Sequence, residues 1–377
     1  MQRLTAAVRD RLLPAAAHLR PSRWEPTEDT VLIIQPDHLG DILLSQLAVR
    51  HLRLRFPDSR LVAVVGPWSR EIAEMSWPVD EILTVEFPGF TRERSMSMTA
   101  PYRQLTAESQ RLRALHPRSA YVLRPDGWWA AWLASLIAPE VVTAADPRTS
   151  AFATRTAVVH DGDHASVRAF RIASNGDDAR VPTVLSDPLH LTPSPDAVAL
   201  ATRLLRSHRV NGGYVVIHPG SGASVKEWPA QRWRHVASAL ADAGYSIVLT
   251  GSMPERVITD GIARDGTGAV NLAGQTTVPV LTEILRGASL VLGPDCGPLH
   301  LAVAADTPSV HLFGPSDPVR YGPWGDPVRH RVISAGWRCP RCGDLSAGRG
   351  SGCGCMLAIQ PNEVAAVARA LLANHAR

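Results

Sequence analysis

Short apolar runs alternate with stretches of helical periodicity along the first half of the chain. Residues 31–34 and 61–66 are apolar runs typical of buried strands, and residues 42–55 between them carry apolar side chains at helical spacing. A strand, a helix and a second strand in this order form a βαβ unit, which implies a parallel sheet. Further strands are expected at 82–85, 120–123 and 141–143, and a further helix at 129–137.

The same alternation begins again near residue 213. Two halves of this kind predict an α/β protein with two Rossmann-like, doubly wound domains that face each other across a central cleft. Ligands are then expected at the carboxyl ends of the strands. In this half, strands are expected at 214–217, 246–250, 270–272, 290–293 and 309–313, and helices at 230–243, 255–264, 278–287 and 299–305.

Changes in composition suggest where these domains begin and end. Residues 86–118 are polar and arginine-rich, and we interpret them as a mobile loop, as a flap on the acceptor side, or as a surface excursion without function. The predicted division is an N-terminal extension at 1–29, a first Rossmann-like domain at 30–185, a linker region at 186–212, a second Rossmann-like domain at 213–360 and a C-terminal helix at 361–377.

Charge and hydropathy exclude several classes of protein. The formal net charge is only +4 and no run of five like charges occurs, which argues against a nucleic-acid-binding protein. The sequence has neither an apolar stretch of the roughly 20 residues that span a bilayer nor a recognisable signal peptide, so we expect a cytoplasmic protein. Residues 1–29 show helical spacing of apolar residues among arginines. This segment is either a helix in peripheral contact with the inner face of the membrane or a frayed surface segment.

One lysine stands out among the basic residues. Of 39 basic side chains, 38 are arginine, and the exception is Lys226. It follows the predicted strand 214–217 and a turn that contains Gly220, Ser221 and Gly222. A phosphate ligand is favoured by the backbone amides of such a turn and by a compact ammonium group. The alternative explanation of Lys226 is a composition bias towards arginine that spared one lysine.

Two further loops of the second half also end strands. Glu255 follows one of them, where a carboxylate either binds ribose hydroxyls or caps the next helix. The other strand is followed by Asp295, Cys296 and Gly297. Asp295 is a candidate N-cap of the next helix, and the free backbone amides at the start of that helix favour a pyrophosphate ligand. His300, one turn into that helix, is either a ligand contact or a satisfied core histidine.

In the first half, the loop that begins at Pro36 is the candidate for acid–base chemistry. Asp41 is either a helix N-cap or a base that deprotonates an acceptor hydroxyl, and His38 is the rival base. Another strand ends in Arg124, Asp126 and Trp128. We expect these three residues and His38 to bind the acceptor, with Arg124 suited to an acidic or phosphorylated one. The alternative for the tryptophans nearby is packing on the sheet.

Four of the five cysteines lie close together near the C-terminus. Four thiols are enough for a tetrahedral zinc site, so structural zinc is one hypothesis, and a reduced thiol cluster or a disulfide is the other. An odd count that is clustered at one end is not a secreted disulfide framework and fits a reducing compartment. The four candidate ligands are Cys339, Cys342, Cys353 and Cys355.

At these loops the sequence resembles the ADP-heptose glycosyltransferases, which form glycosyltransferase family 9. The resemblance runs from about residue 30 to 372, and Cys296 departs from it because the family usually has Thr or Ser there. The matching stretches include Leu39-Gly40-Asp41-Ile42-Leu43, His218-Pro219-Gly220-Ser221, Lys226 with Trp228-Pro229, and Asp295 with Gly297-Pro298-Leu299-His300.

The resemblance implies a GT-B fold, inversion at the anomeric carbon and no metal requirement for catalysis. It also implies that Asp41 is the catalytic base, that Lys226 binds phosphate, and that Glu255 lies near the ribose. The implied donor is an ADP-sugar, and the acceptor is a glycan, a lipid-linked sugar or a natural product. A transferase that uses another nucleotide sugar and a non-catalytic nucleotide-sugar-binding protein are the alternatives.

Overall fold

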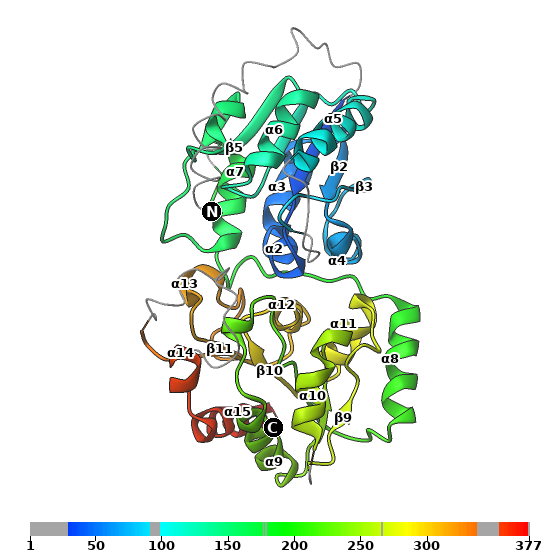
Figure 1. Ribbon diagram of the computed structural model, residues 1–377, viewed down its shortest axis with the longest axis vertical. Coiled ribbons are helices and arrows are strands. Elements are labelled where there is room, and N and C mark those ends of the chain that lie inside the picture. The colour runs from blue at the N-terminus through cyan, green and yellow to red at the C-terminus, as the bar shows by residue number, and fades with distance from the viewer. Residues whose placement is uncertain are drawn as a thin grey trace. The chain divides into compact units, whose positions relative to one another are not determined.

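The computed structural model describes residues 29–90, 99–175, 177, 179–264, 267–337 and 354–375 of the chain. The chain divides into two compact units, an N-terminal unit that ends at Pro182 and a C-terminal unit that begins at Thr183. Each unit is built around one parallel sheet with helices on both of its faces (Figure 1). The division falls between Pro182 and Thr183, a few residues before the predicted linker region at 186–212.

The N-terminal unit contains six parallel strands in the order β3-β2-β1-β4-β5-β6. The order reverses between β1 and β4, which pair directly with each other. Such a reversal leaves a crevice at the carboxyl ends of the two strands, where ligands of doubly wound sheets bind. The elements are β1 (Thr30–Gln35), α2 (Leu39–Leu44), α3 (Gln46–Arg55), β2 (Arg60–Val65), η2 (Pro67–Ser69), α4 (Arg70–Ser76), β3 (Glu81–Thr84), α5 (Ala100–Arg113), β4 (Ser119–Val122), α6 (Trp128–Ile137), β5 (Glu140–Ala144), η3 (Ser150–Phe152), β6 (Arg155–Ala157) and α7 (Ala165–Ser174).

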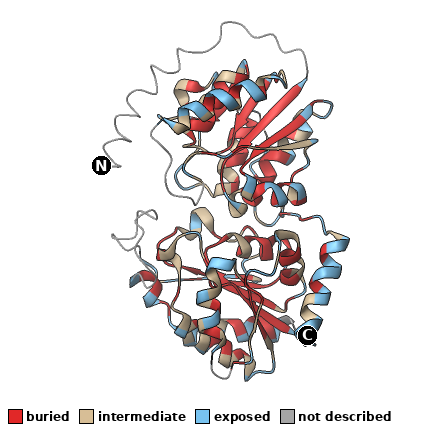
Figure 2. Ribbon diagram, turned by 45° about the vertical axis from the view of Figure 1, so that its right-hand side comes forward, coloured by how far each residue is buried: buried red, intermediate tan, exposed pale blue. Residues whose placement is uncertain are grey.

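Helices cover both faces of this sheet because its central strands are apolar on both sides. Leu32 and Ile34 of β1 pack in one core with residues of α5 and α6, whereas α3 packs against α7. Every residue of β1 is buried, and the central strands form the buried interior of the unit (Figure 2). A continuous apolar run rather than an alternating one is what a strand covered on both faces requires.

The C-terminal unit repeats this architecture. Its strands lie in the order β12-β11-β10-β7-β8-β9, all parallel, and the order reverses between β7 and β10. The elements are α8 (Pro195–Ser207), β7 (Tyr214–Ile217), η4 (Ser224–Lys226), α9 (Ala230–Ala241), β8 (Ser246–Leu249), η5 (Met253–Glu255), α10 (Arg256–Ala263), β9 (Val270–Asn271), α11 (Val278–Arg286), β10 (Leu290–Pro294), α12 (Gly297–Ala304), β11 (Ser309–Phe313), α13 (Pro318–Tyr321), β12 (His330–Ser334), α14 (Gly354–Ala358) and α15 (Pro361–His375).

One large core holds the C-terminal helix on this second sheet. Trp228 and Trp233 are fully buried and contact each other edge to face, with ring centroids 4.9 Å apart. They pack with α9, α15 and the central strands. Arg232 donates hydrogen bonds of 2.6 Å to the carbonyl oxygens of Leu357 and Ile359, and so ties the segment before α15 to α9.

Two predictions for the N-terminal unit were wrong in detail. The expected helix at 42–55 is two helices, α2 and α3, divided at Ser45, whose hydroxyl donates to the Asp41 carbonyl oxygen at 2.7 Å. A hydroxyl that bonds four residues back competes with the regular ladder of the helix. The polar segment 86–118 is not a continuous loop, because it contains α5. Only Leu105, Ser109 and Leu112 of that helix are buried, so its apolar stripe is too narrow to recognise in an arginine-rich stretch.

Several short elements were not predicted at all. The sequence analysis missed α4, β6, α7, α13 and β12, which lie at the edges of the sheets or carry mixed polar sequences. The segment 91–98, the extension before residue 29 and three of the four clustered cysteines lie outside the described residues. None of the helices in the described part of the chain is both long and apolar enough to span a membrane.

Candidate functional site

The reversal points of the two sheets bring together the loops that carry the candidate residues. In the N-terminal unit, the loop after β1 holds Asp37 and His38, and the loop after β4 holds Arg124 and Asp126. In the C-terminal unit, the glycine-containing loop after β7 faces the loop after β10, which holds Asp295. Each unit therefore has one candidate site, and both lie where this topology places ligands.

In the N-terminal unit, a buried carboxylate contacts a guanidinium across the reversal point. Asp37, whose side chain is 7% exposed, forms a close ion pair with Arg124. Arg124 Nε lies 2.7 Å from Asp126 Oδ1, and Arg148 Nη1 lies 3.3 Å from Asp126 Oδ2. Arg148 Nε also lies 3.1 Å from Asp146 Oδ1. The result is a chain of alternating carboxylates and guanidiniums along the carboxyl ends of the strands.

The pKa values of Asp37 and Asp126 are shifted in opposite directions, although both carboxylates contact Arg124. Burial and the negative charge of Asp41 raise the pKa of Asp37 to about 7, although Arg124 acts in the opposite direction. The pKa of Asp126 is lowered by Arg124 and Arg148, which outweigh the effect of its burial. Asp37 therefore retains its proton to a higher pH than Asp126 does.

This shift predicts an unusual pH dependence of stability. A raised pKa means that the folded chain binds the proton more tightly than the unfolded chain does. The resulting stabilisation is fully present below the ordinary value of 3.8 and is lost as the pH rises through about 7. In thermal unfolding between about pH 5 and pH 8, we expect the Asp37→Asn variant to lose less stability than the unmodified protein, with a difference on the order of 1–4 kcal/mol.

An exposed aspartate provides the control for that comparison. Asp58 lies on the surface between α3 and β2, at the other end of the strands, and Asp58→Asn should leave the pH profile unchanged. Parallel profiles for Asp37→Asn and the unmodified protein would contradict a proton held by Asp37.

Asp41 lies in the first turn of α2 and is half-buried. The sequence analysis considered it as the N-cap, but the N-cap is His38, whose side chain makes no capping bond. Asp41 is therefore not explained by capping, and its carboxylate has a favourable interaction with the dipole at the helix start. His38 itself is exposed, with its ring 5.4 Å from the ring of Trp68 and 6.2 Å from the ring of Phe90.

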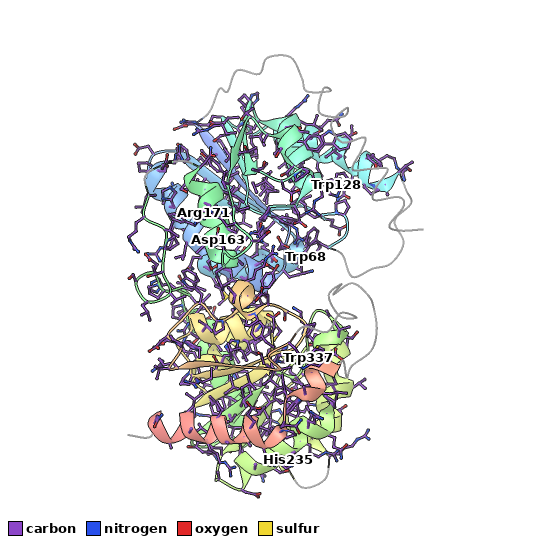
Figure 3. All side chains as sticks on the ribbon, turned by 90° about the vertical axis from the view of Figure 1, so that its left-hand side faces the viewer. Trp68, Trp128, Asp163, Arg171, His235 and Trp337 are labelled. Carbon is purple, nitrogen blue, oxygen red and sulfur yellow. The ribbon has the colours of Figure 1, made fainter. Side chains whose placement is uncertain are left out.

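A pocket of about 270 Å³ opens beside this charged chain. Phe90 and Trp128 contribute aromatic walls, and Arg124 lies over the Phe90 ring at 5.0 Å from its centroid. Trp128 and Trp68 both belong to this unit (Figure 3). The neighbouring Trp129 is buried and donates to the Pro101 carbonyl oxygen at 2.9 Å, and its indole therefore packs in the core. The complete lining is Pro36, Phe87, Pro88, Gly89, Phe90, Arg124, Asp126, Gly127, Trp128, Trp129, Ala130 and Arg148.

In the C-terminal unit, the single lysine forms an ion pair across the reversal point. Lys226 Nζ lies 2.7 Å from Asp295 Oδ2, and His300 Nε2 lies 3.9 Å from Asp295 Oδ1. Burial alone would raise the pKa of Asp295, but the neighbouring imidazole of His300 and the charge of Lys226 lower it well below its usual range. Asp295 was considered as a cap for α12, and that prediction was wrong: the N-cap is Cys296, and Asp295 orients Lys226 instead.

Two polar groups at this point have bonding capacity that the described residues do not use. His300 is 5% exposed, and its Nδ1 has no hydrogen-bond partner there. An ammonium group has three donor protons, of which Asp295 takes one from Lys226. A ligand with several acceptor oxygens would satisfy the remaining ammonium protons of Lys226, whereas Nδ1 of a neutral His300 whose Nε2 carries the proton is an acceptor. Cys296, at the start of α12, is buried, and burial raises the pKa of its thiol.

The glycine loop lies against Glu255. A side chain at Gly220 would collide with the Glu255 carboxylate, so only glycine allows this approach. Glu255 accepts hydrogen bonds from Ser252 N at 2.6 Å and Ser252 Oγ at 2.7 Å, in a capping box at the start of η5. His218, which precedes the loop, is buried, and burial lowers its pKa against the opposing charge of Glu255. Glu255 therefore has the capping role that was one of its two predicted roles. The second oxygen of the Glu255 carboxylate faces the glycine loop.

A pair of substitutions separates capping by Glu255 from ligand binding. Ser252→Ala removes one bond of the capping box but keeps the carboxylate, and we expect a loss of about 1 kcal/mol in stability with ADP affinity unchanged. Glu255→Ala should lower stability by a similar amount and also weaken ADP binding if the carboxylate contacts ribose. Thermal unfolding and calorimetric titration with ADP measure the two effects. Equal ADP affinities for the two variants would leave Glu255 with capping alone.

The structure brings most of the predicted residues to the two reversal points and adds others. The segment after β7 carries Gly220, Ser221 and Lys226, Asp295 directly follows β10, and His300 lies in α12. Gly222 is exposed, with open space where a side chain would begin. The sequence analysis passed over Asp37, Arg148 and His218. A signal for Asp37 was present, because it is an acidic residue two positions after the buried strand β1, but its pairing with Arg124 depends on strand order.

The comparison with known proteins is consistent with this geometry. The family model described as glycosyltransferase family 9 (heptosyltransferase) matches residues 111–342, which is more than half of the chain. The chain belongs to glycosyltransferase family 9. Membership of this family makes it a glycosyltransferase, and the match includes both the loop of Lys226 and that of Asp295.

Individual members of the family are more distant in sequence. The chain is 36% identical to lipopolysaccharide heptosyltransferase 3 of Escherichia coli K12 over 123 residues, which cover 32% of this chain and 36% of that protein. It is 24% identical to lipopolysaccharide heptosyltransferase 1 of the same strain over 305 residues, which cover 78% of this chain and 91% of the relative. The first similarity is local, and the second extends over both units.

Solved structures of family 9 enzymes share the fold. The structure of E. coli ADP-heptose lps heptosyltransferase II has a TM-score of 0.71 at 22% identity, and the similarity covers 92% of this chain and all of that one. An iron-containing dodecameric glycosyltransferase from enterotoxigenic E. coli has a TM-score of 0.53 at 17% identity, over 94% of this chain and 78% of that one. The predicted GT-B class, with two doubly wound units, is thereby confirmed.

Proposed function

We propose that this chain transfers a heptose, or a related sugar, from an ADP-sugar to an acceptor hydroxyl, with inversion at the anomeric carbon. The observation that carries the proposal is the cluster of Lys226, Asp295 and His300 at the reversal point of the C-terminal sheet. It offers the ammonium group of Lys226 to a diphosphate at the place where nucleotides bind in doubly wound sheets. The family, and the names of its relatives, favour heptose and ADP.

The C-terminal unit would bind the donor. Lys226 supplies a point charge for the diphosphate, and the loop of Gly220 and Ser221 supplies backbone amides close to it. The N-terminus of α12 adds a dipole of favourable sign. As the glycosidic C1–O bond of the donor breaks, the bonding electrons go to the diphosphate oxygen, and these groups stabilise the charge that develops there. In this scheme no divalent ion is required for the transfer step.

The N-terminal unit would supply the base and bind the acceptor. Asp41 accepts the proton of the acceptor hydroxyl while its oxygen attacks C1 from the face opposite the leaving group. Trp128 and Asp126 line the pocket next to the base, with His38 on the exposed loop before α2. The acceptor is a glycan, a lipid-linked sugar or a natural product. A cytoplasmic location, where nucleotide sugars are made, completes the proposal.

The donor assignment is tested with a panel of sugar nucleotides. ADP-heptose, and to a lesser extent other ADP-sugars, should support release of the nucleotide diphosphate, whereas UDP- and GDP-sugars should not. Calorimetric titration with ADP should show binding that is insensitive to a chelator. Activity with a UDP- or GDP-sugar alone would replace the ADP assignment, and loss of turnover on chelation would contradict the metal-free scheme.

A structural metal is a separate matter from the transfer step. Of the four clustered cysteines, Cys355 is described and is buried as a free thiol, and the other three lie outside the described residues. A family-9-like structure that contains iron makes metal analysis of the purified protein worthwhile. A structural site would be identified by one metal ion per chain that is lost in Cys355→Ser while ADP binding is retained. A protein purified without metal would instead support the alternative of reduced thiols or a disulfide.

A further inference from the structure

Glycines follow three neighbouring strands of the C-terminal sheet. Gly220 lies after β7, Gly251 after β8 and Gly274 after β9, and these strands are adjacent in the sheet. Both pairings are parallel, so the carboxyl ends of the three strands share one edge. Gly274 N donates a hydrogen bond of 2.8 Å to the Gly251 carbonyl oxygen, which joins the segments after β8 and β9.

The short helix η5 extends side chains over both ends of this row of glycines. Glu255, its last residue, occupies the space where a side chain at Gly220 would begin. Met253, its first residue, does the same at Gly274, where a Cβ atom would lie 2.8 Å from Met253 Cε and 3.2 Å from Met253 Sδ. Gly274 has φ +75°, a left-handed conformation that also favours glycine. The thioether of Met253 therefore lies across bare backbone at the end of β9.

Met253 exposes apolar surface at this edge. Its side chain is 60% exposed, although it belongs to the same turn as the half-buried Glu255. Single exposed apolar residues are common on protein surfaces, so exposure alone assigns no role to Met253. Its position is more informative, because ligands of doubly wound sheets bind at the carboxyl ends of the strands. A thioether in that place can contact the flat face of an aromatic ring.

The polar and apolar groups along this edge follow the order of the parts of a nucleotide. Lys226 and Asp295 meet between β7 and β10, Glu255 reaches the end of β7 from the turn after β8, and Met253 covers the end of β9. Neighbouring strands are about 4.8 Å apart, so the two steps from β7 to β9 span roughly 10 Å. This is the scale on which a nucleotide extends from its diphosphate through its ribose to its base.

We propose that Met253 is the contact surface for the nucleobase of the donor and that it favours a purine over a pyrimidine. The inference rests on the proposed function, because it takes Lys226 to hold the diphosphate. It deepens that function by assigning the residue that contacts the base. The preference follows from area, since a fused two-ring base covers more of the thioether than a single ring does. Adenine and guanine have faces of similar size, so Met253 separates ADP from UDP and not ADP from GDP.

Calorimetric titration of the full chain with ADP, UDP and inorganic pyrophosphate tests the assignment. In Met253→Ala we expect ADP affinity to fall roughly three- to tenfold, as the loss of a sulfur–aromatic contact produces. UDP affinity should fall less, and pyrophosphate affinity should not change because that probe has no base. Met253→Leu keeps an apolar side chain of similar volume and should restore most of the ADP affinity.

An exposed apolar residue elsewhere in the same unit provides the matched control. Val328 is 66% exposed and lies just before β12, at the amino ends of the strands. Val328→Ala should leave the affinities for all three probes unchanged. Thermal unfolding of Met253→Ala should match that of the unmodified protein, because truncation of a largely exposed side chain has little effect on stability.

Four results would overturn the inference: unchanged ADP affinity in Met253→Ala, equal losses for ADP and pyrophosphate, equal losses for ADP and UDP, or tighter binding of UDP than of ADP by the unmodified protein. The first of these, with ADP still bound, rejects the base contact and leaves the proposed donor standing. A chain that binds neither nucleotide nor pyrophosphate rejects the proposed donor, and the base contact with it.

Discussion

Replacing Asp41 by Asn should lower the turnover number by about 10²–10⁴-fold and leave ADP affinity unchanged. The amide has the shape of the carboxylate but cannot take the proton from an acceptor hydroxyl. Asp41 does not cap α2, and its half-buried position leaves the carboxylate accessible. Single-turnover kinetics with ADP-heptose and calorimetric titration with ADP separate the chemical step from donor binding.

Neighbouring residues of the same loop provide the controls for Asp41→Asn. His38→Gln tests the rival base, and Asp37→Asn tests the buried carboxylate that holds its own proton. Both variants should retain far more turnover than Asp41→Asn. If His38→Gln or Asp37→Asn lost as much as Asp41→Asn, the base would have to be reassigned. Full turnover of Asp41→Asn would remove the proposed mechanism.

Replacing Lys226 by Ala should weaken ADP binding by roughly 10–100-fold, with a parallel loss of turnover. The ammonium group is the cation paired with Asp295, at 2.7 Å. Without this ammonium group, the Asp295 carboxylate, whose side chain is 7% exposed, loses its partner. It then stays charged and repels the diphosphate. Calorimetry with ADP at low and moderate salt measures the loss, and the salt dependence of binding should weaken in the variant.

Charge-matched variants distinguish phosphate binding from a purely structural ion pair. Lys226→Arg keeps the charge but replaces a point charge with a planar fork, and it should bind ADP with intermediate affinity. The double variant Lys226→Met with Asp295→Asn removes both charges. It should regain the thermal stability lost in Lys226→Ala without regaining ADP affinity. Normal ADP affinity in Lys226→Ala would show that the ion pair serves the fold alone.

Much of the fold was predictable because the central strands are buried on both faces. Continuous apolar runs at β1, β2, β7, β10 and β11 leave no other plausible location for these segments. The elements that were missed have weaker local signals. Helix α5 buries a narrow stripe in an arginine-rich sequence, and β6 and β12 lie at the edges of the sheets, where fewer residues are covered.

The chain itself determined the positions of Asp41, the glycine loop and Lys226, because each lies in the segment between a buried strand and the next helix or within the first turn of that helix, and local sequence is enough to place it. Only the tertiary structure decided which charges meet. Asp37 and Arg124 are 87 residues apart in sequence, and Lys226 and Asp295 are 69 apart. They come together because β1 pairs with β4 and β7 pairs with β10, and strand order is fixed by packing of the whole sheet. The same pairing sets the charges that the acceptor and the donor would meet.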